Sequence, residues 1–314
     1  MTVAVLPGSM KPVLAPHLPD WLDARFFDDA DELLALAPEA EIGWLDYYVN
    51  GSTATIEAVK RAEKLRWLVT IGAGVDYLPL DVLLARGVMI TNGTGLSAAP
   101  IAEYVLMAML AFAKDYRAVM RMQDRREWPN DAPGKRQLAG SRALVIGYGS
   151  IGREVARRLR AFDVEVQAVT RSGGEGLLRP DEWRAHLGRF DWVILSAPAT
   201  ADTRHMIGVA ELAAMKADAV LVNVARGTLV DQQALTEALA AMRIGGTILD
   251  VTDPEPLPAT DPLWELDNVH ITMHLSGRSQ DTVYTRAAER LLANLEVYRA
   301  GDPPQPLYDR ARGY

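Results

Sequence analysis

The sequence contains no cysteine. This absence excludes disulfide bonds, thiolate nucleophiles and metal sites built from thiolates, and we predict no metal site. It leaves the cellular compartment open, with the cytoplasm as the default expectation.

An excess of positive charge is also missing. The formal net charge is -8 and the pI is near 5.2, so binding to nucleic acid or to an anionic membrane surface is disfavoured, and any phosphate binding has to be local. Residues 1–9 lack the basic start and apolar core of a signal peptide, which favours a cytoplasmic protein. The most apolar helical stretch, Ile101–Ala113, contains Glu103 and falls well short of the ~20 apolar residues that span a bilayer. We therefore expect a buried helix there and no membrane partner.

The residues that are present have the composition of a globular α/β protein. Of the 314 residues, 49% are hydrophobic and 24% are charged. This length is more than a single hydrophobic core usually fills, so we expect two domains.

Short apolar runs alternate with helix-length segments along the chain, a pattern typical of parallel sheets. A first series of predicted strands comprises residues 3–6, 42–45, 68–71 and 88–90. A second series comprises residues 143–146, 164–169, 192–195, 219–224, 248–251 and 269–272. Between the two series, residues 100–123 are predicted to form one long helix, followed by a boundary segment at 128–140. A last helix over 281–299 carries one apolar stripe and is expected to pack onto the first domain: Val283, Ala287, Leu291, Leu295 and Tyr298.

A phosphate-binding loop is predicted at the start of the second series. Gly147, Gly149 and Gly152 form G-x-G-x-x-G between an apolar strand and a helix whose stripe is Ile151, Val155, Leu159 and Phe162. In this setting the glycines allow a tight turn, a close approach of the backbone to a pyrophosphate and close helix–strand packing. The alternative interpretation is a glycine-rich turn without a ligand.

The end of the next strand predicts the choice of dinucleotide. NAD-binding members of this fold place a carboxylate there, which bonds the ribose 2′-hydroxyl. Here the residues are Thr170, Arg171 and Ser172, which offer a guanidinium and hydroxyl donors suited to a 2′-phosphate. NADP(H) is therefore the preferred cofactor, with NAD(H) as the alternative if Arg171 is only a solvated loop residue.

Three charged or titratable side chains follow the last three predicted strands: Arg226, Glu255 and His274. Each alone has a simpler interpretation, as a surface ion pair, a turn acid or a packed histidine. The carboxyl ends of parallel strands share one edge of a sheet, so the three can meet there. Reduction of a 2-keto acid needs a cation for the carboxylate, a proton donor for the carbonyl oxygen and an anion that keeps the donor charged, and these residues meet those needs in that order.

A second glycine-rich loop ends a strand of the first series. Gly72, Ala73 and Gly74 precede Val75 and Asp76, and successive backbone N–H groups in such a loop can bind the substrate carboxylate. A tight turn in which Asp76 caps a helix is the alternative interpretation.

The sequence resembles the D-isomer-specific 2-hydroxyacid dehydrogenase family over nearly its whole length. The motifs that carry the resemblance are GAGVD at 72–76, Ala-Glu at 102–103, GYGSIG at 147–152, NVARG at 223–227, LDV with EPLP within 249–258, and the His274 segment. Within the family the chain is most similar to the glyoxylate/hydroxypyruvate reductase A type, through residues 170–172 and 309–314.

The resemblance implies two doubly wound parallel-sheet domains. These are a discontinuous flavodoxin-like substrate domain at 1–98 and 284–314 and a Rossmann NAD(P)-binding domain at 99–283, in a homodimer built through the 100–123 region. It implies that Arg226 binds the carboxylate and carbonyl, that His274 donates the proton and that Glu255 is its partner. It also extends the expected cofactor contacts beyond the glycines and the 170–172 loop: Ser150, Ile151, Ala197, Pro198, Thr203, Val224, Ala225, Arg226, Asp250, His274 and Ser276.

The sequence departs from the family pattern at three positions. Met273 replaces the Pro that usually precedes the catalytic His, Ser276 replaces a small residue, and Thr252 replaces a common aromatic. Tyr48 and Trp128 are candidates for the wall of the substrate pocket, with plain packing as the alternative.

The function that these features predict is an NADPH-preferring reductase of a short 2-keto acid such as glyoxylate or hydroxypyruvate. Two alternatives remain. One is a dinucleotide-sensing binding protein with little turnover, like the corepressor branch of the family. The other is a reductase of bulkier 2-keto acids.

Overall fold

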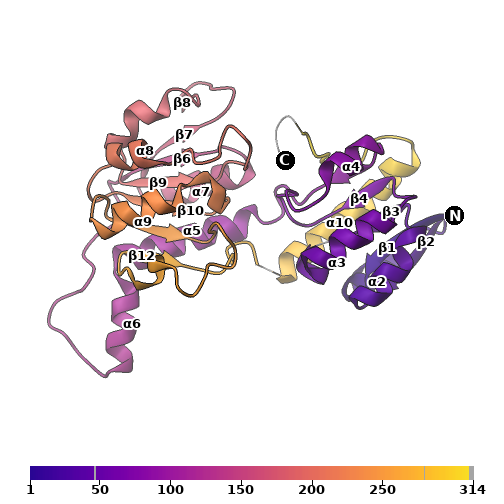
Figure 1. Cartoon of the computed structure of the whole chain (residues 1–314), viewed down its shortest axis with the longest axis horizontal. Helices are drawn as coiled ribbons and strands as arrows, with labels where there is room; N and C mark the ends of the chain where they lie inside the picture. The colour runs from indigo at the N-terminus through magenta and orange to yellow at the C-terminus, as the bar shows by residue number, and fades with distance from the viewer. Residues whose placement is uncertain (46, 279, 311–314) are drawn as a thin grey trace. The chain divides into compact units, whose positions relative to one another are not determined.

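The structure is a computed structural model that describes residues 1–45, 47–278 and 280–310, with side chains at all of these except 47–50, 52, 280 and 281. The chain divides into two compact units, which we call unit 1 (Met1–Ser97 with Ser279–Tyr314) and unit 2 (Ala98–Arg278). Figure 1 shows each unit as a sheet with helices packed against it.

Unit 1 contains a five-stranded parallel sheet in the order β2-β1-β3-β4-β5. Its strands are β1 (Thr2–Pro7), β2 (Leu22–Phe27), β3 (Ile42–Trp44), β4 (Trp67–Val69) and β5 (Met89–Thr91). This is the flavodoxin-like order, which confirms the predicted fold class for this part of the chain. Strand β2 is absent from the sequence prediction because Asp23 and Arg25 interrupt its apolar residues, and it lies at the sheet edge beside β1.

Helices cover both faces of this sheet. They are α1 (Lys11–Leu14), α2 (Ala30–Leu36), α3 (Tyr47–Arg61), α4 (Leu80–Ala85) and α10 (Gln280–Arg299), with short 3-10 turns at Gly8–Met10, Ala15–His17 and Ala37–Glu39. One core cluster joins Leu6 and Trp67 of the sheet to Leu291 and Leu295 of α10. The predicted apolar stripe of the last helix is thus confirmed, and it packs within unit 1.

Unit 2 contains a seven-stranded parallel sheet in the order β12-β11-β10-β9-β6-β7-β8. Its strands are β6 (Arg142–Ile146), β7 (Glu165–Val169), β8 (Leu177–Leu178), β9 (Trp192–Leu195), β10 (Val220–Asn223), β11 (Gly246–Leu249) and β12 (Val269–Ile271). Strand order reverses at β6, which is the Rossmann arrangement predicted from the sequence. The two-residue strand β8 is too short to give an apolar pattern and escapes the prediction.

The helices of unit 2 are α5 (Ala98–Ala113), α6 (Tyr116–Asp124), α7 (Ser150–Arg160), α8 (Val209–Ala214) and α9 (Gln232–Ala240), with 3-10 segments at Trp183–Arg189, Gly227–Leu229 and Pro262–Glu265. One core cluster packs α5 and α7 on one face of the sheet, and a second packs α8 and α9 on the other. Among the residues that the structure describes, no helix has the length and apolar character to cross a membrane.

Two helix predictions in unit 2 are wrong in detail. The expected single helix over 100–123 is two helices, because Asp115 adopts a left-handed conformation (φ 45°, ψ 49°) and caps the start of α6 by accepting a hydrogen bond from the Ala118 N–H. Figure 1 shows α6 extending away from the sheet of this unit. Phe162, expected on the buried stripe of α7, lies beyond the end of that helix and is 41% exposed.

Candidate active site

The loops after three adjacent parallel strands, β10, β11 and β12, carry Arg226, Glu255 and His274. His274 and Glu255 are in direct contact: Nδ1 of the imidazole lies 2.9 Å from Oε2 of the carboxylate. The pairing expected from the sequence is therefore present in the geometry of unit 2.

Glu255 is held as the charged partner of this pair. Burial raises the pKa of its carboxyl group, but the hydrogen bond and charge of His274, the N–H of Thr252 and the charge of Arg226 together lower the pKa below its usual value. The Thr252 N–H donates to Oε1 at 3.2 Å, which leaves Oε2 for the histidine. Glu255 is thus ionised near neutral pH and accepts the Nδ1–H, so that Nε2 is the ring nitrogen able to transfer a proton to a substrate.

The loop that carries Arg226 is shaped by Asn223. Its side chain accepts a hydrogen bond from the Ala225 N–H at 3.0 Å and donates one to the Arg226 carbonyl at 2.8 Å. A Cβ atom at Gly227 would lie 2.0 Å from the carbonyl carbon of Thr252, so only glycine lets this loop approach the one that holds Glu255. The half-buried guanidinium of Arg226 donates from Nη1 to the Ala225 carbonyl at 2.8 Å. The close approach of the two loops at Gly227 explains why the positive charge of Arg226 lowers the pKa of Glu255.

The predicted phosphate loop lies between β6 and α7. Gly147 has φ +101°, and a Cβ atom there would lie 2.5 Å from the Ala197 nitrogen. A Cβ atom at Gly152 would lie 2.0 Å from the Gly147 carbonyl oxygen, whereas one at Gly149 would meet nothing within 4 Å. Gly149 also begins α7 without a side-chain cap, so the first N–H groups of the helix, at Ser150 and Ile151, lack that partner. The turn is therefore closely packed at Gly147 and Gly152, and it leaves free space at Gly149, where the helix begins. A pyrophosphate bound at the helix N-terminus needs such space.

Thr170, Arg171 and Ser172 follow β7, the strand beside β6. The Thr170 N–H donates to Leu178, and the side chains of Arg171 and Ser172 are exposed. A second guanidinium, absent from the sequence prediction, lies against this loop: a Cβ atom at Gly173 would come within 3.1 Å of Arg179 Nε. Within the described residues, the Arg179 guanidinium has no hydrogen bond or ion pair. The sequence analysis did not identify Arg179, because this residue lies near the loop only through the pairing of β8 with β7.

The other predicted cofactor residues of unit 2 lie at the ends of β9 to β12. Ala197, Pro198 and Thr203 line a turn in which the Thr203 hydroxyl donates to the Pro198 carbonyl at 2.7 Å. The side chains of Val224 and Ala225 belong to the two core clusters of the unit, so contact with a dinucleotide would come mainly from their backbone. Asp250 and Ser276 are buried and hydrogen-bonded to each other.

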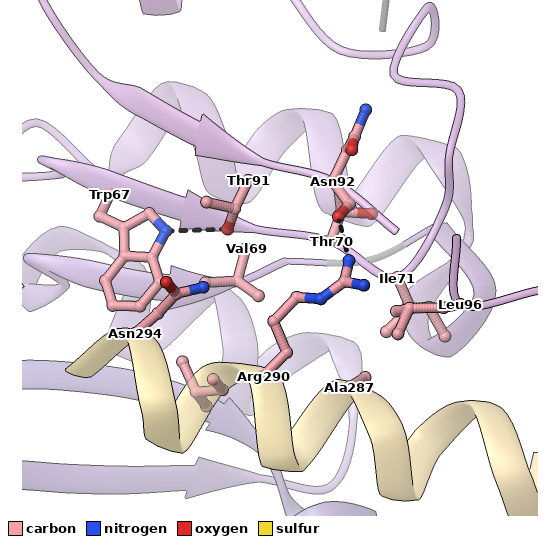
Figure 2. A pocket seen from close by; sticks show the side chains of 11 residues that line it. Trp67, Val69, Thr70, Ile71, Thr91, Asn92, Leu96, Ala287, Arg290 and Asn294 are labelled. Atoms are coloured by element: carbon pink, nitrogen blue, oxygen red, sulfur yellow. Dashed lines mark hydrogen bonds between the residues drawn. The ribbon is translucent and has the colours of Figure 1, made fainter. Parts of the chain in front are cut away.

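The loop of Gly72, Ala73 and Gly74 lies in unit 1 and is supported from α10. Arg290 donates from Nη1 to the Asn92 carbonyl at 3.1 Å, and Asn92 Nδ2 donates to the Ala73 carbonyl at 2.9 Å. Figure 2 shows Arg290 reaching from α10 toward the strand ends that carry Thr70 and Asn92. The cavity beside it measures about 10 Å³, room for about one water molecule, so it is not a substrate pocket.

The two candidate pocket-wall aromatics have different outcomes. The side chain of Tyr48 lies outside the described residues. Trp128 follows α6 and is 96% exposed, so in the single chain it does not pack against the catalytic set. Its proposed role as a pocket wall remains a prediction.

The chain is similar to known dehydrogenases in sequence and in structure. The family model described as D-isomer specific 2-hydroxyacid dehydrogenase, NAD binding domain, matches residues 106–276. A glyoxylate reductase of Korarchaeum cryptofilum is 32% identical over 81% of this chain and 79% of that protein. The crystal structure of a D-isomer specific 2-hydroxyacid dehydrogenase from Xanthobacter autotrophicus in complex with NADPH and MES is 27% identical, covers 100% of both chains and has a TM-score of 0.79.

Other relatives are longer than this chain. A D-3-phosphoglycerate dehydrogenase of Methanocaldococcus jannaschii is 33% identical over 74% of this chain but only 45% of its own length. The chain spans about half the length of the phosphoglycerate dehydrogenases that it matches. The family model covers more than half of the chain, and the glyoxylate reductase is matched over most of its length. The chain therefore belongs to the D-isomer specific 2-hydroxyacid dehydrogenase family.

Proposed function

We propose that this protein is an NADPH-preferring reductase that converts a short 2-keto acid of the glyoxylate or hydroxypyruvate kind to the 2-hydroxy acid. The observation that carries the proposal is the hydrogen-bonded pair of His274 and Glu255, whose Nδ1 and Oε2 atoms lie 2.9 Å apart. The pair lies in the loops after β11 and β12, and Arg226 lies in the loop after the neighbouring strand β10. The same sheet carries the glycine-rich turn between β6 and α7. The Korarchaeum relative named glyoxylate reductase supports the substrate class.

The roles of the residues follow from charge and geometry. The reduced nicotinamide, when bound, supplies the hydride that reaches the carbonyl carbon. His274 donates a proton from Nε2 to the carbonyl oxygen, so the keto acid gains one hydride and one proton and becomes the 2-hydroxy acid. Glu255 orients the imidazole through its contact with Nδ1 and so directs Nε2 toward the substrate. Arg226 offers a guanidinium to the carboxylate and to the carbonyl oxygen as negative charge develops there.

In this proposal, unit 1 is the substrate domain. The backbone N–H groups of Ala73 and Gly74 would bind the carboxylate of the keto acid, whereas the Gly72 N–H donates to Thr70 Oγ1 at 3.3 Å and shapes the turn. The hydrogen bonds from Arg290 to Asn92 and from Asn92 to Ala73 would hold the backbone of this loop in its present conformation. Unit 2 would bind the dinucleotide through Gly147, Gly149 and Gly152.

The preference for NADPH rests on the loop after β7. Arg171 and Ser172 are exposed there, and the Arg179 side chain lies over Gly173. Two guanidinium groups beside one loop suit a 2′-phosphate, which carries about two negative charges. The similar Xanthobacter structure contains NADPH, which agrees with this assignment.

Replacing Arg171 with Ala is expected to weaken NADPH binding about 10- to 100-fold while changing NADH binding less than about threefold, because a charge-assisted hydrogen bond contributes about 1.5–3 kcal/mol. Fluorescence titration of each reduced cofactor measures both constants. Arg189→Ala is a matched control, since Arg189 is exposed on the same unit away from this loop. An equal loss of affinity for NADPH and NADH would contradict the 2′-phosphate role.

The proposed activity is tested by following the loss of reduced-nicotinamide absorbance with glyoxylate, hydroxypyruvate, pyruvate and phenylpyruvate, each with NADPH and NADH. Turnover with a short acid and NADPH is the expected result. Turnover only with phenylpyruvate would favour a reductase of bulkier acids. Tight dinucleotide binding without turnover of any acid would favour a dinucleotide-sensing protein.

A homodimer built through the 100–123 region is part of the proposal. Met107 on α5 and Tyr116 on α6 are 57% and 52% exposed, and Trp128 beyond them is 96% exposed. Exposed large apolar side chains favour association. Light scattering on a gel-filtration column measures the mass, and a single peak at 34.4 kDa would contradict the dimer.

A further inference from the structure

The backbone of His274 is held in an unusual conformation. Its φ angle is +54°, in the left-handed region that residues other than glycine adopt only uncommonly. Such a conformation is strained and persists only where surrounding contacts over-determine it. The contacts around His274 therefore decide where its imidazole is placed.

Asp250 supplies those contacts on both sides of the histidine. It is 1% exposed, and its backbone carbonyl accepts the His274 N–H at 2.8 Å. Its Oδ1 accepts the Thr272 hydroxyl at 2.7 Å and the Leu275 N–H at 2.8 Å, and its Oδ2 accepts the Ser276 N–H at 3.1 Å. One buried carboxylate thus ties the chain before and after residue 274 to the end of β11.

Tyr104 extends this network to helix α5. Its hydroxyl is hydrogen-bonded to the Thr272 hydroxyl. Because Thr272 has one hydroxyl hydrogen and donates it to Asp250, it accepts the bond from Tyr104. Burial raises the pKa of Tyr104 and outweighs the hydrogen bond to Thr272, which lowers it; the charge of Asp250 raises the pKa further, so the phenol stays a neutral donor. Tyr104 has no part in the proposed reaction, yet it fixes the orientation of Thr272.

Met273 makes this network more important in the present chain. A proline at this position would fix φ at residue 273 and restrict Thr272 to extended conformations. Met273 imposes neither restraint and is 64% exposed. Its N–H makes no hydrogen bond within the described part of the chain. The backbone before His274 is therefore restrained by side-chain hydrogen bonds rather than by a proline ring.

We propose that Tyr104 and Thr272, acting through Asp250, are positioning residues for His274. This inference rests on the proposed function, because it concerns the placement of the proton donor. Loss of the Tyr104 hydroxyl would leave the fold and the dinucleotide loop intact but would loosen the restraint on residues 272–276.

Replacing Tyr104 with Phe tests the proposal with the loss of one oxygen atom. We expect kcat to fall about 10-fold, with the KM of the keto acid and the affinity for NADPH changing less than about twofold, since small displacements of a catalytic group lower the rate far more than they lower binding. Thr272→Val should give a loss of at least this size, whereas Thr272→Ser, which keeps the hydroxyl, should retain most of the activity. Tyr298→Phe is the matched control, because Tyr298 lies on α10 in unit 1, where its ring stacks on Trp67.

Two further results would decide the inference. In the Tyr104→Phe background, Met273→Pro should recover kcat several-fold, because the ring restores a backbone restraint by another route. A Tyr104→Phe enzyme that melts at a lower temperature but has the parent kcat would overturn the proposal, as would a loss of NADPH affinity equal to the loss of kcat.

Failure of the proposed function can be told apart from failure of this inference. The rate at which diethyl pyrocarbonate modifies His274, with the His274→Gln variant as the blank, needs no turnover. Faster modification of His274 in Tyr104→Phe than in the parent would support the positioning role even if no keto acid is reduced. An unchanged modification rate together with an unchanged kcat would overturn it.

Discussion

Replacing His274 with Gln is expected to lower kcat about 10²- to 10⁴-fold, the range that general acid catalysis usually contributes. Glutamine keeps a polar group that can hydrogen-bond Glu255 but has no proton to transfer at neutral pH. Steady-state oxidation of NADPH in the presence of the keto acid measures the loss. NADPH affinity should stay within about threefold of the parent value, because hydrogen bonds of the backbone around Asp250 do not depend on the imidazole.

Two variants control for this result. His17→Gln changes an exposed histidine of unit 1 and should leave kcat unchanged. Glu255→Gln removes the carboxylate that orients His274 and should give a loss of kcat smaller than that of His274→Gln. Turnover retained by His274→Gln would show that another group supplies the proton.

Replacing Arg226 with Gln is expected to lower kcat/KM for the keto acid about 10²- to 10³-fold. Removing one partner of a desolvated charge pair costs about 2–5 kcal/mol, and each 1.4 kcal/mol is a factor of about ten. If Arg226 binds only the carboxylate, most of the effect should be a higher KM. If it also stabilises the carbonyl oxygen, KM should rise and kcat should fall. The position of the guanidinium is set by the Asn223 side chain and by the close approach at Gly227.

The lysine variant sharpens this test. Arg226→Lys keeps the charge but loses the planar pair of donors that matches a carboxylate, so it should recover only part of the lost kcat/KM. Arg189→Gln, on an exposed 3-10 segment of unit 2, should behave as the parent. A fall in NADPH affinity as large as the fall in kcat/KM would show that Arg226 supports the cofactor site instead.

Local sequence pattern was sufficient to predict most of the secondary structure. Buried parallel strands are continuous apolar runs, so segments such as Trp192–Leu195 could be placed from the sequence alone. Strand β2 was not predicted because it lies at an edge, where Asp23 and Arg25 are tolerated. The break between α5 and α6 was missed because the left-handed conformation of Asp115 leaves no mark in the apolar periodicity.

The sequence by itself determined the chemistry that this protein has available. The glycine spacing at 147–152, the Arg171 loop without a carboxylate, and the residues Arg226, Glu255 and His274 after successive strands are all local features. Parallel strands place their carboxyl ends at one edge of a sheet, so the position of each side chain just after a predicted strand was enough to predict that they could meet.

Only the tertiary structure decided how those groups are held. Tyr104 and Thr272 are far apart in the chain, and their hydrogen bond exists because α5 packs on the face of the sheet next to the end of β12. Arg179 reaches the Arg171 loop because β8 pairs with β7. Hydrogen bonds between distant residues depend on distances of a few tenths of an ångström, which only the packed chain defines.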